Sequence, residues 1–187
     1  MPPKVKISKQ DIIDTALALL REGGEGAVNA RSIAAALGCS TQPIFSNFSS
    51  MEELEESVTL AAYECYLGFL SREAGSGKYP AYKSFGMAYI RFAKEERELF
   101  RHLFMCDRRG KEVKLTSDFD ESVEMIMKAN SIPRELAQLI HLEMWVSVHG
   151  IAAMLATSFL DLGEELISDI LTDIYQGIRA RHLTEGN

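Results

Sequence analysis

The sequence is poor in cysteine, and its few cysteines lie far apart. Three occur among 187 residues, at positions 39, 65 and 106, with no C-x-x-C pair. An odd number of distant cysteines argues against a disulfide framework and against a zinc site. The H-E-x-x-H spacing of zinc hydrolases is also missing. We therefore expect buried thiols, no bound metal and no cofactor.

A long hydrophobic run is missing as well. No uninterrupted stretch reaches the roughly 18 apolar residues of a membrane helix, and no apolar segment follows the basic N-terminal residues Lys4 and Lys6. The composition, 47% hydrophobic and 25% charged, is that of an ordinary globular protein. These features predict a cytoplasmic protein that does not enter the membrane.

Sequence signatures of enzymes are scarce. Neither the phosphate-binding spacing G-x-x-x-x-G-K-[ST] nor the nucleophile elbow G-x-S-x-G occurs. Asp118, Asp120 and Glu121 cluster, but they lie at the start of an expected helix, where acidic residues stabilise the helix dipole. The chain is not expected to be an enzyme.

Positive charge is in short supply overall but is unevenly distributed. The formal net charge is -7, which by itself argues against binding to nucleic acid. Residues 1–50, however, hold five basic and four acidic residues, a formal charge of +1 that leaves -8 for the remainder. This asymmetry suggests that residues 1–50 face nucleic acid and that the remainder of the chain forms an acidic domain.

The sequence is rich in helical periodicity. Apolar residues recur with a spacing of three and four, and no run alternates as a strand does. We predict an all-α protein whose first three helices, within residues 8–48, form one domain of residues 1–50. The later helices, expected at 50–75, 80–95, 96–106, 118–130, 133–158 and 163–183, form a second domain of residues 51–187.

The first domain carries the signals of a helix-turn-helix. Asn29 can cap a short helix that ends at Gly38, a residue suited to the left-handed conformation. Ser40 can cap the next helix, and Pro43 falls in its first turn, where a missing N-H costs nothing. Two short helices joined by a tight glycine turn are typical of DNA-binding heads.

The last two expected helices carry apolar stripes, Leu136 to Leu155 and Leu166 to Ile178. Each stripe can face the subunit's own core. Residues 133–158 also carry apolar side chains on other faces, including Leu139 and Trp145, which suggests burial on more than one side. We expect a homodimer formed through these two helices.

Residues 29–54 read NARSIAAALGCSTQPIFSNFSSMEEL. This segment resembles the signature of the TetR family of transcriptional regulators, with a short helix, a glycine turn, a recognition helix and an aromatic-x-x-Phe pair before a long helix. The resemblance covers about residues 8–60. It implies a homodimer whose two heads bind an inverted-repeat DNA operator and whose C-terminal domain is a helical ligand-binding and dimerisation domain for a small-molecule effector.

Two residues depart from the family pattern. Many members have Tyr where this chain has Phe45 and Lys where it has Met51. Both positions commonly contact DNA phosphate, and neither side chain here can make that contact. Weaker binding to the DNA backbone is the expected consequence, with Lys4, Lys6 and Lys9 compensating.

The candidate DNA-binding residues lie in the N-terminal arm and the helix-turn-helix. We expect Gln42 and Thr41 to read base edges, since an amide matches adenine, and the Pro43 ring to contact a thymine methyl. Asn29, Ser40 and Asn47 suit phosphate, while Asn29 and Ser40 can also act only as helix caps. The full set is Lys4, Lys6, Asn29, Arg31, Ser40, Thr41, Gln42, Pro43, Phe45 and Asn47.

The candidate effector residues are aromatic, methionine and histidine side chains of residues 60–160. A pocket between helices is lined by such residues with a few polar groups among them. The same residues can equally be core, and His149, one turn from Trp145, can be a buried histidine bonded to a neighbour. The set is Tyr66, Tyr89, His102, Met105, His141, Trp145 and His149.

Two functions fit these features. The first is a sequence-specific DNA-binding repressor released when an effector binds. The second is a helical protein-interaction adaptor whose helix-turn-helix holds a partner protein, as the weak basic charge permits. A palindromic sequence recovered from random DNA would distinguish them.

Overall fold

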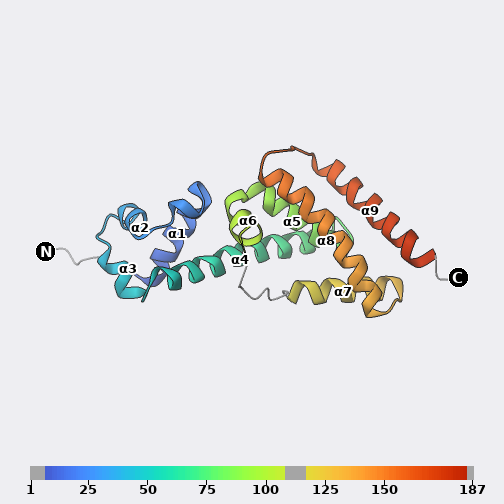
Figure 1. Cartoon of the computed structure of the whole chain (residues 1–187), viewed down its shortest axis with the longest axis horizontal. Helices are drawn as coiled ribbons and strands as arrows, with labels where there is room; N and C mark the ends of the chain where they lie inside the picture. The colour runs from blue at the N-terminus through green and yellow to red at the C-terminus, as the bar shows by residue number, and fades with distance from the viewer. Residues whose placement is uncertain (1–6, 108–116, 185–187) are drawn as a thin grey trace. The chain divides into compact units, whose positions relative to one another are not determined.

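The computed structural model describes residues 7–107 and 117–184, and within these residues it contains helices and no strand (Figure 1). The predicted all-α class is confirmed. The chain forms two compact units. Unit 1 comprises residues 1–67 and 96–106, and unit 2 comprises residues 68–95 and 107–187.

Unit 1 contains the predicted three-helix head and two further segments. Its elements are α1 (Lys9–Gly23), a 3-10 turn η1 (Glu25–Ala27), α2 (Ala30–Ala36), α3 (Gln42–Asn47), the first part of α4 (Met51–Ser76) and α6 (Arg97–Phe104). Helix α1 packs against α2, α3 and α6. The predicted functional division at residue 50 differs from the boundaries of these compact units and stays a prediction.

Local hydrogen bonds set the helix ends of unit 1. The Ser8 side chain accepts from the Asp11 amide at 3.1 Å while the Asp11 carboxylate accepts from the Ser8 amide at 2.8 Å, which forms a capping box. Asn29 accepts from the Ser32 amide at 3.0 Å, so its predicted capping of α2 is confirmed. Caps of this kind stabilise a helix by about 1 kcal/mol.

The cap predicted for α3 is wrong. Helix α3 begins at Gln42, and Thr41 rather than Ser40 occupies its N-cap, with no side-chain hydrogen bond to the helix. The turn before α3 is instead stabilised by hydrogen bonds between backbone groups. Gly38 has φ +64°, and the Cys39 amide donates to the Ala34 carbonyl at 2.9 Å. Because this turn already orders the chain, α3 forms without a cap from a serine side chain.

Apolar side chains from every helix of unit 1 meet in one core. Helix α1 contributes Ile12, Ala16 and Leu20, the helix-turn-helix contributes Ile33, Ile44 and Phe48, and α6 contributes Leu99, Phe100 and Leu103. On the unit 1 part of α4 the buried residues are Leu54, Val58, Ala62 and Tyr66. This core holds the two short helices, which lack the length to be stable alone.

Unit 2 is organised around one central helix. Helix α8 (Arg134–Ala156) packs against α5 (Ala81–Glu95), α7 (Ser117–Asn130) and α9 (Glu164–Thr184), and it forms an antiparallel hairpin with α9 (Figure 1). A side chain at Gly86 of α5 would lie 3.3 Å from Val148 and 3.5 Å from Leu171. The absence of a side chain at Gly86 therefore allows α5 to approach α8 and α9 closely.

Helix α8 also carries an exposed apolar face. The predicted stripe faces inward, since Ile140, Met144, Val148, Ile151 and Leu155 are buried. Exposed apolar side chains lie on another face of the helix. They are Leu139, Leu142, Trp145 and Val146.

The absence of a membrane-length segment was also predicted, and here the structure differs. Helix α8 is long and apolar enough to cross a membrane by length and composition. A core helix of a soluble protein passes the same test, and nine residues of α8 are buried in unit 2. The sequence prediction missed the helix because it considered uninterrupted apolar runs, and polar residues such as His141, Glu143 and Ser147 interrupt this run without ending its helical pattern.

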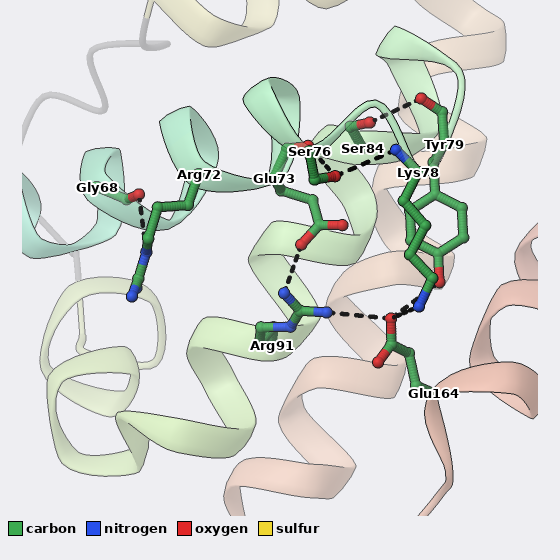
Figure 2. Close-up of polar contacts among 9 residues, drawn as sticks. All are labelled: Gly68, Arg72, Glu73, Ser76, Lys78, Tyr79, Ser84, Arg91 and Glu164. Carbon is green, nitrogen blue, oxygen red and sulfur yellow. Dashed lines mark hydrogen bonds and ion pairs between the residues drawn. The ribbon is translucent and has the colours of Figure 1, made fainter.

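A buried carboxylate lies where α4, α5 and α9 meet. Glu73 of α4 is only 2% exposed, and Arg91 of α5 donates to it at 2.6 Å. The same guanidinium donates to Glu164 of α9 at 3.0 Å, and Glu164 also accepts from Lys78 at 2.6 Å and Tyr79 at 2.9 Å (Figure 2). These polar contacts fix the start of α9 against α5.

Candidate nucleic-acid interface and effector residues

The helix-turn-helix presents a compact polar surface. Helices α2 and α3 are joined by the Gly38 turn and are anchored through the buried side chains of Ile33, Ile44 and Phe48. Because these anchors face inward, the opposite side of α3 is exposed. Gln42, Phe45 and Ser46 are exposed there, while Thr41, Pro43 and Asn47 are half-buried.

Several polar side chains of α3 are already engaged within the helix. The Asn47 amide donates to the Pro43 carbonyl at 2.8 Å, and the Ser46 hydroxyl donates to the Gln42 carbonyl at 2.9 Å. The Gln42 side chain makes no hydrogen bond within the described residues. Of the two amides on α3, that of Gln42 is therefore the one available for an outside partner.

Positive charge on the described part of the head is partly neutralised. Lys9 lies 2.7 Å from Glu53 and over the Phe48 ring at 4.5 Å, and Arg21 lies 2.7 Å from Glu96. Hydrogen bonds from Lys9 and from Ser49 lower the pKa of the Glu53 carboxyl to about 2, so this pair stays charged. Lys9 thus links α1 to α4 through an ion pair at the surface, and its predicted contact with phosphate stays a prediction.

Arg31 differs from these two cations. It is exposed on α2 and has no ion-pair partner within residues 7–107 and 117–184. Lys4 and Lys6, the other predicted phosphate contacts, lie outside the described residues.

The seven candidate effector residues fall into both compact units. Tyr66, His102 and Met105 belong to unit 1, whereas Tyr89, His141, Trp145 and His149 belong to unit 2.

In unit 1, His102 has two well-defined partners. Its Nδ1 lies 2.7 Å from a Glu25 carboxylate oxygen and its Nε2 lies 2.8 Å from the Thr59 hydroxyl. These contacts join α6 to η1 and to α4. Tyr66 is buried with its ring edge against Phe104, at 5.3 Å, and Met105 is partly exposed at the end of α6. The contacts of His102 and Tyr66 hold unit 1 together.

In unit 2, three of the predicted residues form a cluster. The Tyr89 hydroxyl lies 2.9 Å from Nδ1 of His149, and the Trp145 ring stacks on the His149 ring at 5.4 Å with planes 16° apart. Burial lowers the pKa of His149, so the neutral imidazole can accept the Tyr89 proton at Nδ1. Tyr89 is buried while Trp145 is half-exposed, so the cluster leads from the core to the surface.

A second tyrosine-histidine pair lies on the same two helices. The Tyr82 hydroxyl lies 2.9 Å from Nδ1 of His141, and the Phe119 ring meets the His141 ring edge-on at 4.6 Å. Burial lowers the pKa of His141 to about 4 and raises that of Tyr82. Each side chain is therefore neutral near pH 7 and satisfies the other within the core.

The sequence prediction missed Tyr82 and Phe119 as partners of His141. A signal was available, because Tyr82 and Tyr89 are seven residues apart on one helix while His141 and His149 are eight apart on another. Both spacings are close to two helical turns, so paired helices can bring the residues together twice. The Glu73–Arg91 pair had no such signal.

The sequence model of the family described as "Bacterial regulatory proteins, tetR family" matches residues 12–58. This match covers α1, the helix-turn-helix and the start of α4. The N-terminal domain of the chain is therefore a TetR-family domain. The earlier resemblance, based on residues 29–54, is thereby confirmed.

Solved structures share the fold along nearly the whole chain. A protein of unknown function from Rhodococcus sp. RHA1 has a TM-score of 0.73 at 18% identity, covering 95% of this chain and 98% of that one. A TetR family protein from Vibrio parahaemolyticus has a TM-score of 0.63 at 16% identity, covering 90% and 97%. The multidrug binding protein EbrR, complexed with imidazole, has a TM-score of 0.57 at 17% identity, covering 89% and 93%.

No curated protein sequence matches the chain. The chain has the fold of the DNA-binding transcriptional regulators of the TetR family, and members of this family are regulators rather than enzymes. Among the described residues, no group of three or more His, Cys, Asp or Glu side chains is placed to hold a metal ion.

Proposed function

We propose that this TetR-family protein is a homodimeric repressor that binds an inverted-repeat operator and releases it when a small-molecule effector binds. The observation that carries DNA binding is the exposed face of α3. Gln42, Phe45 and Ser46 project from a helix whose other side is anchored in the core by Ile44. A helix held in this way can enter the major groove of DNA with its side chains already ordered.

Support for the dimer comes from the exposed apolar face of α8. Leu139, Leu142 and Val146 follow a helical spacing, with Trp145 beside them, and Leu166 of α9 is half-exposed. A cluster of large apolar side chains on a surface favours an interaction site. A second copy of this chain is the occupant we propose, since two heads would then bind two half-sites of an inverted repeat.

The effector site we propose is the cluster of Tyr89, Trp145 and His149. It combines aromatic surface with two hydrogen-bonding groups, the composition of a site for a small, partly apolar molecule. EbrR, which shares the fold, binds multiple drugs and was solved with imidazole, and this supports a small-molecule effector here.

Selection of bound duplexes from a random DNA pool, using the full chain, tests the function directly. We expect a palindromic consensus with two equal half-sites. A pool that shows no enrichment would overturn DNA recognition. It would favour the alternative function, a protein-interaction adaptor. A surface with little unpaired positive charge and an exposed Phe45 suits a protein partner.

A further inference from the structure

The recognition helix carries no charged side chain. Its six residues are Gln-Pro-Ile-Phe-Ser-Asn, and only Gln42, Phe45 and Ser46 are exposed. In the major groove, guanine offers two acceptors that Arg or Lys reads, and cytosine offers an amino donor that Asp or Glu accepts. Helix α3 has none of these four residue types, so it lacks the usual means of selecting a G·C pair.

The one available amide on α3 suits adenine. Gln42 is exposed and its side chain makes no hydrogen bond within the described residues, whereas the Asn47 amide is held by the Pro43 carbonyl at 2.8 Å. A glutamine amide can donate to N7 and accept from the N6 amino group of adenine at the same time. No other base edge in the major groove presents this pair of groups.

Phe45 is exposed although every neighbouring apolar anchor is buried. Its side chain is 54% exposed, while Ile44 and Phe48 on the same short segment are almost fully buried. The phenyl ring cannot bond phosphate, and in the major groove its apolar counterpart is the thymine methyl group. Phe45 lies three residues after Gln42, so both side chains lie on one face of the helix.

Resting on the DNA-binding function proposed above, we infer that α3 selects A·T base pairs. The Gln42 amide reads an adenine, and the Phe45 ring packs against the methyl group of a thymine in the same or an adjacent pair. Phe45 is then a determinant of sequence rather than a contact to the DNA backbone.

Replacement of single thymines by deoxyuridine tests this inference, because it removes one methyl group and nothing else. The probe is the duplex selected from the random pool, scanned one thymine at a time with the full chain. We expect one position in each half-site at which the loss weakens wild-type binding by about fourfold, the equivalent of one buried methylene. Gln42→Ala should weaken binding about 10-fold to 100-fold.

Variants of Phe45 supply the decisive comparison. Phe45→Ala should bind thymine and deoxyuridine duplexes equally, and Phe45→Leu should keep part of the preference for thymine. The control Glu22→Gln, at an exposed position of α1 outside the proposed DNA-binding set, should keep all of it. Equal melting temperatures will show that these exposed substitutions leave the fold intact. The role of Phe45 is overturned if Phe45→Ala loses as much affinity as the wild type when thymine is replaced by deoxyuridine. It is also overturned if the wild type loses no affinity at any thymine.

The base composition of the selected site provides a separate outcome. A consensus with G·C pairs at the centre of each half-site overturns the selection of A·T pairs while leaving the proposed DNA-binding function intact. A pool without enrichment overturns both.

Discussion

Glu73 and Arg91 form an ion pair in which the carboxylate is almost completely buried and the guanidinium reaches solvent. The two groups lie 2.6 Å apart, with side-chain exposures of 2% for Glu73 and 37% for Arg91. Removing one partner of such a pair costs more than removing both, because the remaining charge stays buried without compensation.

Arg91→Met should therefore destabilise the protein by about 2 to 4 kcal/mol, somewhat less than for a fully buried pair because Arg91 keeps contact with water. The double variant Glu73→Gln with Arg91→Met should recover part of this loss. Arg72→Met is the matched control, because Arg72 lies next to Glu73 on α4 but is exposed. Urea unfolding measures all three, and a double variant less stable than Arg91→Met would contradict the buried-charge explanation.

The stability of the protein should depend on pH through His141. Burial lowers the pKa of His141 to about 4, compared with 6.5 for an exposed histidine. Between these values the unfolded chain binds a proton that the folded chain does not, so stability falls as the pH falls from 6.5 to 4. The full loss from this group is up to about 3 kcal/mol.

Unfolding free energies measured at several pH values check this contribution. His141→Gln should reduce the slope between pH 6.5 and 4. Val148→Ala, a buried substitution on the same helix without a titratable group, should lower stability by a similar amount at every pH. An unchanged slope in His141→Gln would show that the acid sensitivity arises elsewhere.

The salt dependence of DNA binding should separate Arg31 from Lys9. Arg31 is exposed without an ion-pair partner in the described part of the chain, whereas Lys9 is held by Glu53 at 2.7 Å. Arg31→Ala should reduce the slope of log K against log salt by about 0.9 for each protomer, as one phosphate contact is lost. Lys9→Met should leave the slope nearly unchanged. Fluorescence anisotropy across a salt series measures these slopes. A larger change for Lys9→Met than for Arg31→Ala would make Lys9 the phosphate contact instead.

Charge introduced on the exposed face of α8 should separate the dimer. Leu142→Glu and Val146→Glu would each bury an unpaired carboxylate in the proposed interface, a cost of about 3 kcal/mol that corresponds to roughly 100-fold weaker association. Phe159→Glu, at an exposed apolar residue of the loop after α8, is the control and should remain dimeric. Sedimentation at micromolar concentration measures the state of each, and a monomeric wild type would refute the dimer itself.

Effector binding should be visible through Trp145, the only tryptophan of the chain. A molecule bound beside its stacked partner His149 would change the indole fluorescence, and imidazole with a panel of small aromatic compounds is the first probe set. His149→Ala should weaken the response while leaving DNA binding without ligand largely intact.

Tyr89→Phe serves as the matched variant, because it removes only the hydroxyl that lies 2.9 Å from His149. Linkage requires that any compound detected in this way weakens operator binding, and that DNA weakens binding of the compound by the same factor. A lower melting temperature in His149→Ala with unchanged ligand affinity would make His149 a core residue instead.

Helix positions and the helix-turn-helix could be predicted from the sequence because their signals are local. The caps at Ser8 and Asn29, the left-handed turn at Gly38 and the 3.6-residue periodicity each depend on residues within one or two turns of the chain. Such interactions form in the same way wherever the helix packs, so α2 begins directly after its predicted cap Asn29, and the predicted turn at Gly38 follows it.

The polar partnerships depended on tertiary structure. His102 meets Glu25 and Thr59 across 77 and 43 residues of sequence. Glu73 is buried only because Arg91 is brought to it by another helix. Periodicity shows that a helix has an apolar face but not which elements will cover it, so the exposure of Leu142 and Trp145 could not be predicted. The sequence by itself therefore determined the helices and the head, whereas packing between distant segments decided which side chains are paired, buried or left for a partner.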